Sequence, residues 1–369
     1  MSPKPSRRPG RPVSADSRHR LLAKELRRRL VAGEWPPGTA LPSLRRLAGR
    51  SRVGQYTVRM AVEILRREGL VRTGPHRRLL AAGGPDRGPL SGTVIVVVGG
   101  SLDKFLAMPC GPELLRGIHL AAGEAGAPLL VLQGDRAGPH PPEQALELDL
   151  RGALLVGSLP DAALESYGRL AIPVVVADQP APGRDLHTVT ADNGPAAREA
   201  TARLIAAGHR RLAFVRPIQL GKLLRVDPDA RERQDGFLAA VSEAGLPRSS
   251  WEVFNVLPGD AAGSRSVRAV LEARRPFTAL VAASGSLAGR LADAARAAGR
   301  SVPGDLSIVC FQGREAGFSE FSGPRINFEE IGRRAFDLLA QPRRPAQNVR
   351  IAAEWVDAGS ITPPPGARP

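Results

Sequence analysis

The sequence predicts an α/β protein in two parts: an N-terminal winged helix-turn-helix domain and a larger, doubly wound α/β domain of two subdomains. Three observations support this prediction. Apolar residues recur at helical spacing before residue 70, and two short apolar segments then flank a Gly-Pro turn at Gly74. From residue 93 onward, β-branched runs alternate with Ala-rich helical stretches, a pattern typical of parallel sheets. The excess positive charge lies before residue 91.

The charge is divided unevenly along the chain. Residues 1–90 hold 21 Lys and Arg against 6 Asp and Glu, a net charge of +15, whereas the whole chain carries +16. A basic module attached to a nearly neutral body is typical of nucleic-acid-binding proteins. The sequence therefore predicts double-stranded DNA as a partner of the N-terminal part.

Several other classes of protein are disfavoured by the sequence. Cys110 and Cys310 are far apart and there is no CxxC pair or Cys/His cluster, so we expect no metal site and no cofactor. No run reaches the roughly 18 apolar residues of a membrane helix, and no apolar segment follows the basic N-terminus as in a secretory signal. We therefore expect a cytoplasmic protein without membrane contact.

Residues 41–71 predict two short helices joined by a tight turn. Apolar positions such as Leu47, Val58, Val62 and Leu65 give each helix one buried stripe. The opposite faces carry Arg45, Arg46, Arg50, Arg52, Arg59, Arg66 and Arg67. A cationic outer face suits a major-groove reader, although a solvated basic helix hairpin is the plain alternative.

The boundaries follow from composition. Residues 1–15 are basic and Pro-rich, so we expect a disordered tail. Arg8–Pro12 resembles the Gly-Arg-Pro core of minor-groove arms, with a solvated tail as the alternative. The winged helix is expected over residues 16–83, a linker over 84–92, and the second domain over 93–362.

The N-terminal domain resembles the GntR-type winged helix over about residues 17–82. The motifs are Gly33-Glu34, Pro37-Gly38, Leu41-Pro42-Ser43, Leu47-Ala48, Thr57-Val58-Arg59 and Glu68-Gly69-Leu70-Val71. The resemblance implies a phosphate contact for Arg45. It also implies base and phosphate contacts for Gln55, Tyr56, Thr57 and Arg59, and a minor-groove position for His76 and Arg77 in the wing.

One local departure concerns Gly54-Gln55, where the family usually has Ser or Thr followed by Arg. Gly54 is a weaker N-cap than Ser. Gln55 cannot form the bidentate guanine contact of an arginine and suits adenine instead. We therefore expect an operator preference that differs from the commonest one in the family.

The second domain resembles the effector domain of LacI/GalR-type regulators, a periplasmic binding protein-like fold of type I. The motifs are Ile172-Pro173-Val174-Val175, Asp192-Asn193, Gly208-His209-Arg210-Arg211-Leu212, Arg233-Gln234-Asp235-Gly236-Phe237 and Val302-Pro303-Gly304-Asp305-Leu306. The resemblance implies two subdomains, about 93–187 with 314–342 and 188–312 with 345–360.

Polar residues at predicted strand ends mark a candidate effector site. Open α/β sheets bind ligands beyond the carboxyl ends of their strands. The candidates are Ser101, Asp178, Asn255, Ser284 and Gln312, and the resemblance adds Arg233 as a cleft arginine for a ligand hydroxyl or carboxylate. Loop hydration or helix capping is the plain alternative for each polar residue at a strand end.

Two signs of carbohydrate binding are missing where the resemblance places them. The chain has Ser284-Gly285 in place of an acidic residue, and Cys110-Gly111 in place of an aromatic pair. The resemblance also implies an Asp near position 312, where this chain has Gln312. We therefore expect either an effector that is sugar-like but not an ordinary free sugar, or a cleft without ligand control.

The function predicted from the sequence is that of a DNA-binding transcriptional repressor controlled by a small molecule. A homodimer would bind a roughly palindromic operator. The alternatives are a regulator that has lost effector control, a solute-binding protein and an α/β enzyme. Phosphate-binding, dinucleotide-binding and nucleophile-elbow motifs are missing from the sequence, so no catalytic residue is predicted.

Overall fold

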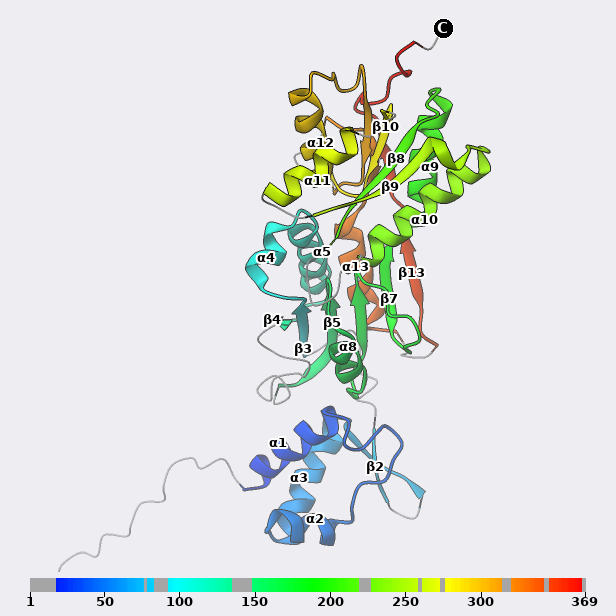
Figure 1. Ribbon diagram of the computed structural model, residues 1–369. Coiled ribbons are helices and arrows are strands. Elements are labelled where there is room, and N and C mark those ends of the chain that lie inside the picture. Colours follow the sequence, from blue (N-terminus) through cyan, green and yellow to red (C-terminus); the bar gives the residue numbers. More distant parts are fainter. Residues whose placement is uncertain are drawn as a thin grey trace, which may run out of the picture.

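The computed structural model shows a small head, residues 18–82, below an elongated body, residues 92–366 (Figure 1). The structure describes residues 18–75, 78–82, 92–134, 148–218, 227–257, 261–272, 276–313, 320–341 and 345–366. The predicted tail at 1–15 and most of the predicted linker at 84–92 lie outside these residues. Within them, no helix combines the length and apolarity needed to span a bilayer.

The head is a winged helix, as predicted. Its helices are α1 (Arg18–Val31), α2 (Leu44–Ser51) and α3 (Gln55–Arg67), and its wing pairs β1 (Val71–Thr73) with β2 (Leu79–Ala81) in antiparallel fashion. The apolar stripes meet in a core that includes Leu26, Leu47, Val58 and Leu65, each fully buried. Burial of these stripes, rather than helix propensity, holds such short helices in place.

Helix α2 has a well-defined start and end, and the turn to α3 follows it directly. The Ser43 hydroxyl caps α2 by accepting a hydrogen bond from the Arg46 backbone N–H. Arg52 ends α2 in the left-handed conformation, with φ of 50°. Gly54 precedes α3 and gives no side-chain cap, as its sequence implies. The turn therefore exposes the first backbone N–H groups of α3 on the surface of the head.

The lower part of the body is a parallel sheet of six strands in the order β13-β7-β6-β5-β3-β4. The strands are β3 (Thr93–Val98), β4 (Leu129–Gln133), β5 (Leu150–Val156), β6 (Val174–Ala177), β7 (His187–Ala191) and β13 (Asn348–Ile351). Helices α5 (Cys110–Glu124) and α13 (Phe328–Leu338) cover one face, and α8 (Asp161–Gly168) covers the other. The short helix α4 (Leu102–Ala107) precedes α5.

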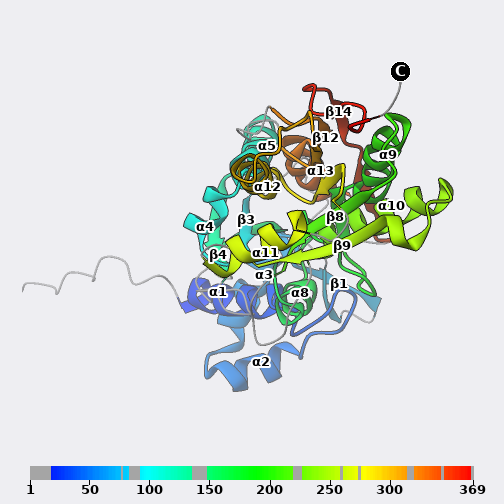
Figure 2. The ribbon, with the colours of Figure 1, turned by 45° about the horizontal axis from the view of Figure 1, so that its top comes forward.

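The upper part is a parallel sheet of four strands in the order β11-β10-β8-β9. The strands are β8 (Leu212–Pro217), β9 (Trp251–Val256), β10 (Ala279–Ala282) and β11 (Ser307–Cys310). Helices α9 (Asn193–Ala206) and α10 (Pro228–Glu243) pack on one face, and α11 (Ala261–Leu271) and α12 (Gly285–Ala297) on the other. Viewed at a tilt, both helix layers of this sheet are visible (Figure 2).

The strand pairing corrects the predicted subdomain boundaries. Residues 188–191 and 348–351 were expected in the second subdomain, but β7 and β13 pair with each other and complete the six-stranded sheet. An antiparallel pair, β12 (Gly323–Arg325) with β14 (Glu354–Val356), lies next to the upper sheet instead. The apolar pattern of a strand shows that it is buried, but not which of two similar sheets it joins.

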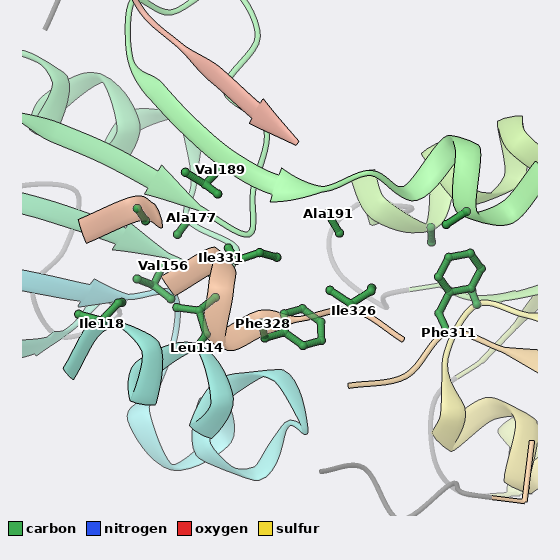
Figure 3. Packing of buried hydrophobic residues seen from close by; sticks show 14 of the residues in the cluster. Leu114, Ile118, Val156, Ala177, Val189, Ala191, Phe311, Ile326, Phe328 and Ile331 are labelled. Atoms are coloured by element: carbon green, nitrogen blue, oxygen red, sulfur yellow. The ribbon is translucent and has the colours of Figure 1, made fainter. Parts of the chain in front are cut away.

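The two parts of the body share one apolar cluster. Phe328 and Ile326 lead from the lower helices toward Phe311 at the upper sheet, and all three are buried (Figure 3). The chain passes between the parts near Asp192, near Gln312 and near residue 352. The connections between the parts are therefore built around apolar packing.

The contact of α5 with α13 makes a first prediction. A Cβ at Gly117 would lie 1.9 Å from the backbone oxygen of Glu329 on α13. We expect Gly117→Ala to cost about 1–3 kcal/mol, because the two helices must move apart. Gly123 lies on the same helix with nothing within 4 Å of an added Cβ, so Gly123→Ala should leave the protein as stable or raise stability by up to about 1 kcal/mol. Thermal unfolding of both variants measures the difference, and equal effects would contradict the proposed packing.

Candidate functional site

The first candidate site is the outer face of α2 and α3 in the head. Both views place α2 on the side of the head away from the body (Figures 1 and 2). Gln55, Tyr56 and Arg59 are exposed at the start of α3, while Thr57 is half-buried and Val58 points into the core. The side chain of Tyr56 is 74% exposed, unusual for an aromatic residue without a partner molecule. Arg45 on α2 is also exposed.

Carboxylates of the head pair with only some of the arginines on this face, since Arg50 pairs with Glu34, and Arg66 and Arg67 pair with Glu63. Among the described residues, no ion pair involves Arg45 or Arg59. Glu34, Glu63 and Glu68 each pair with other arginines, as in the Arg27–Glu68 ion pair that joins α1 to the end of α3. The positive potential is thus concentrated where a phosphate backbone could approach.

His76 and Arg77, predicted in the wing, lie outside the residues that the structure describes. The strands on either side of them, β1 and β2, are paired, so the hairpin predicted from Gly74-Pro75 is present. The isolated bridge between Ala40 and Leu80 ties this hairpin to the segment before α2. The wing is therefore fixed to the helix pair beside it.

The phosphate role of Arg45 and Arg59 makes a second prediction. We expect Arg45→Ala combined with Arg59→Ala to weaken binding to duplex DNA and to reduce the slope of log affinity against log salt by about 2, since each lost phosphate contact releases about one counterion fewer. Titrations of a labelled duplex at several salt concentrations measure this slope.

A control for these variants is Arg268→Ala, which removes one positive charge from the body. Arg268 is exposed on α11 of the upper sheet. It should leave the salt slope unchanged, because it removes a positive charge far from the head. If wild type, the double variant and Arg268→Ala all show the same salt slope, then Arg45 and Arg59 do not contact phosphates.

The second candidate site is a cavity of about 500 Å³ in the body, between its two sheets. Gly157, Ser158, Asp178 and Gln179 reach it from the carboxyl ends of β5 and β6, as expected for parallel sheets. The upper part contributes residues from the end of β8, from α10, from the segment after β11 and from the start of α12. Apolar walls come from Phe105, Met108, Phe311, Ile326 and Phe328.

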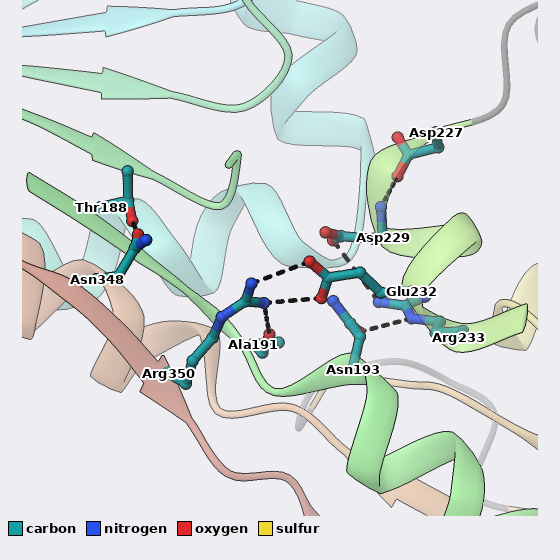
Figure 4. Close-up of polar contacts among 9 residues, drawn as sticks. All are labelled: Thr188, Ala191, Asn193, Asp227, Asp229, Glu232, Arg233, Asn348 and Arg350. Carbon is teal, nitrogen blue, oxygen red and sulfur yellow. Dashed lines mark hydrogen bonds and ion pairs between the residues drawn. The ribbon is translucent and has the colours of Figure 1, made fainter. Parts of the chain in front are cut away.

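Arg233 on α10 is held by several contacts inside this cavity (Figure 4). Its Nε donates to Asn193 Oδ1 at 2.7 Å, and its Nη1 donates to the Ala283 backbone oxygen at 2.6 Å. Its guanidinium lies over the ring of Phe311, 4.4 Å from the centroid, and Nη2 lies 3.8 Å from Asp229 Oδ2. These contacts use two of the five N–H donors, so the fixed guanidinium can still donate to a ligand.

Asp178 is the second charged group of the cavity. It follows β6 directly and adopts φ of 58°, a left-handed conformation that is uncommon for a residue other than glycine. Its Oδ1 is buried without a hydrogen-bond partner among the described residues. Burial raises the pKa of Asp178 well above its usual value, and the nearby Asp229 carboxylate raises it further. An unsatisfied acceptor at this place favours a ligand that donates a hydrogen bond.

Asp229 lies one helical turn before Arg233, at the start of α10. Burial raises its pKa to about 6, against the lowering effect of Arg233, and Asp227 and Glu232 raise it further. Arg350, which pairs with Glu232, lowers it slightly. Among the described residues, the cavity is lined by three carboxyl groups, those of Asp178, Asp227 and Asp229, and by the one guanidinium of Arg233. This excess of acidic groups disfavours strongly acidic ligands.

The candidate residues from the sequence divide into two sets. Asp178, Arg233, Ser284 and Gln312 line the cavity, whereas Ser101 and Asn255 are not among its lining residues. The Ser101 hydroxyl caps α4 through the Lys104 N–H, and Asn255 accepts a hydrogen bond from Arg216. Ser284 caps α12 at its Leu287 N–H while also facing the cavity. Helix capping, the plain alternative for these strand ends, therefore accounts for Ser101.

Sequence reasoning missed several residues of the cavity. Asp229 could have been found, since it lies four positions before Arg233 at the start of a predicted helix. Phe105 and Phe328 gave no such signal, because their helical positions are equally typical of ordinary core residues. Among the described residues, no group of three His, Cys, Asp or Glu side chains could hold a metal ion.

The buried Asp229 makes a third prediction, on stability. Its pKa is about 6 in the folded protein and near 3.8 when unfolded, so the folded state holds the proton more tightly. This contribution is full below about pH 4 and is lost as the pH rises through about 6. Relative to Asp229→Asn, we expect wild type to lose on the order of 2 kcal/mol between those values. Chemical denaturation of both proteins at several pH values measures this difference, and a constant difference would contradict the burial of an ionisable carboxyl group.

Comparisons with known proteins cover both parts of the chain. Residues 20–79 match the family model for bacterial regulatory proteins of the gntR family, and residues 201–361 match the model for a periplasmic binding protein-like domain. The HTH-type transcriptional repressor CytR of Escherichia coli K12 is 31% identical over 287 residues, covering 73% of this chain and 78% of that protein. The HTH-type transcriptional regulator GalR of Salmonella typhimurium LT2 is 26% identical over 239 residues, with 63% and 66% covered.

Among solved structures, a LacI family transcriptional regulator from Enterococcus faecium with bound ribose has a TM-score of 0.59 and 20% identity. The match covers 73% of this chain and 99% of that one. At this identity the likeness establishes the fold of the body and not its ligand. The predicted combination of a GntR-type head with a LacI/GalR-type body is confirmed.

Proposed function

The chain belongs to the LacI-family transcriptional regulators, with a GntR-type DNA-binding head, and we propose that it represses transcription under the control of a small molecule bound in the body. The observation that supports this proposal is that one chain contains both a candidate DNA-binding surface and a candidate ligand-binding cavity. The head presents unneutralised arginines beside an exposed recognition helix, and the body holds a cavity lined by fixed charges. The relatives that match 73% and 63% of this chain are a transcriptional repressor and a transcriptional regulator.

For the head, we propose that α3 enters the major groove. Gln55 and Tyr56 would meet base edges, and Arg45, Thr57 and Arg59 would meet bases or the backbone. The exposed start of α3 supports this assignment, because recognition helices contact bases through their N-terminal residues. A homodimer would place two heads on a roughly palindromic operator, in a cytoplasmic protein.

For the cavity, we propose a neutral ligand with several hydrogen-bond donors and an apolar face. Asp178 and Asp229 would accept from its donors, Arg233 would donate to an oxygen, and Phe105 and Phe328 would contact its apolar face. A sugar-like ring or a nucleoside meets these requirements, whereas a sugar phosphate would face three carboxyl groups. The apolar walls also provide the apolar contact surface that the aromatic pair, missing at Cys110-Gly111, would otherwise provide.

A thermal-shift screen of the full chain against sugars, sugar phosphates and nucleosides tests this proposal. A compound at about 100 times its dissociation constant should stabilise the protein by about 2.7 kcal/mol and raise its Tm by a few degrees. Asp178→Asn should reduce the shift, because the carboxylate acceptor is lost. Asn255→Ala should keep it, since Asn255 does not line the cavity.

The screen also separates the proposal from its main rival. A protein that binds DNA but shows no stabilisation by any compound at millimolar concentration would be a regulator without effector control. A protein stabilised best by a sugar phosphate would contradict the charge argument for the cavity.

A further inference from the structure

The end of α1 does not pack within the head. Val31, the last residue of α1, is 2% exposed, and its apolar neighbours are those of the lower sheet of the body, among them Tyr167, Leu170 and Ile172. The core of the head contains the preceding α1 residues Leu26 and Leu30 but not Val31. One turn of α1 is thus shared between the two parts of the chain.

Backbone contacts strengthen this junction. The Ala171 N–H donates to the Val31 backbone oxygen at 3.2 Å. Gly33 has φ of +80°, and a Cβ there would lie 2.5 Å from the Arg169 backbone oxygen. We call residues 31–33 of the head and 169–171 of the body the head–body joint. Its close approach requires glycine at position 33 both for conformation and for space.

The joint and the cavity lie at opposite ends of the same structural unit. Residues 169–171 follow α8 and precede β6, and Asp149 of the loop before β5 lies close enough to Arg27 on α1 to interact electrostatically. β5 and β6 then run away from the joint and end at Ser158 and Asp178 in the cavity. The Gln179 amide closes that end with two hydrogen bonds to the Leu159 backbone, at 2.8 and 2.9 Å.

We infer that the head is docked on the body through this joint, and that the unit β5–α8–β6 sets the position of the head according to the state of the cavity. The inference rests on the proposed function for its second half. In this arrangement the joint orients the head. In a dimer, a fixed orientation of each head restricts the distance between the two half-sites that the protein accepts.

Two glycines of the head allow a matched test in the full chain. Gly33 and Gly38 both have positive φ, +80° and +86°, so alanine strains the backbone similarly at each. An added Cβ at Gly38 meets nothing within 4 Å, whereas at Gly33 it meets the body. We expect Gly33→Ala to make the Ala171 amide exchange with solvent about tenfold faster or more, and Gly38→Ala to leave that rate unchanged. Val31→Asp, which places a charge in the joint without backbone strain, should act as Gly33→Ala does.

Half-site spacing gives the second readout. Duplexes selected from a random library by wild type and by Gly38→Ala should show one spacing between half-sites, and those selected by Gly33→Ala or Val31→Asp should show several. An Ala171 amide that exchanges equally fast in wild type and in both joint variants would overturn the docking. Faster exchange with unchanged spacing would overturn the role of the joint in orienting the head.

The amide-exchange and DNA-selection measurements distinguish a failure of the joint from a failure of the proposed function. If wild type selects no DNA at all, the proposed function is wrong, while the exchange of Ala171 still decides whether the joint exists. If DNA is selected normally and Ala171 is unprotected in wild type, the proposed function stands and the joint does not.

Discussion

The polarity of the parallel strands is the constraint on which the arrangement of this protein depends. Because all strands of the lower sheet point the same way, their carboxyl ends gather at the cavity and their amino ends gather at the opposite edge. The residues just before β6 meet the head, and the residue just after it, Asp178, meets the cavity. The short strand β6 therefore lies between the residues that meet the head and a residue that lines the cavity.

The charges of the cavity are arranged so that each depends on another. Arg233 keeps its place through Asn193, Ala283 and Phe311, and its guanidinium offsets part of the cost of burying Asp229. Among the described residues, Oδ1 of Asp178 has no hydrogen-bond partner, and its left-handed backbone conformation is uncommon for a residue other than glycine. Because an unsatisfied buried acceptor destabilises the folded protein, a donor from a ligand would both bind there and stabilise the body.

The sequence predicted much of this fold, and the misses have a physical basis. The helical spacing and the β-branched runs identified the winged helix and both parallel sheets, because these signals are local. The placement of Asn348–Ile351 was wrong, since nothing local in a short edge strand distinguishes the sheet it pairs with. A strand end predicted Asp178 near the cavity, and the resemblance to LacI/GalR-type effector domains predicted Arg233. The sequence did not predict the apolar walls, because aromatic residues such as Phe328 also serve the core.

The distance between the head and the cavity excludes a simple electrostatic connection between them. β5 has seven residues, which corresponds to about 20 Å of strand. Two unit charges about 20 Å apart interact by less than about 1 kcal/mol at an effective dielectric constant of about 20, so Asp178 and the head arginines act on each other weakly. What connects the two sites is a continuous unit of packed strands and helix, with the close approach of Gly33 to Arg169 at one end and the Asp178 carboxyl group at the other. A ligand can influence the head through this unit if it changes the position of the strands, and a tightly packed sheet transmits such a shift with little loss.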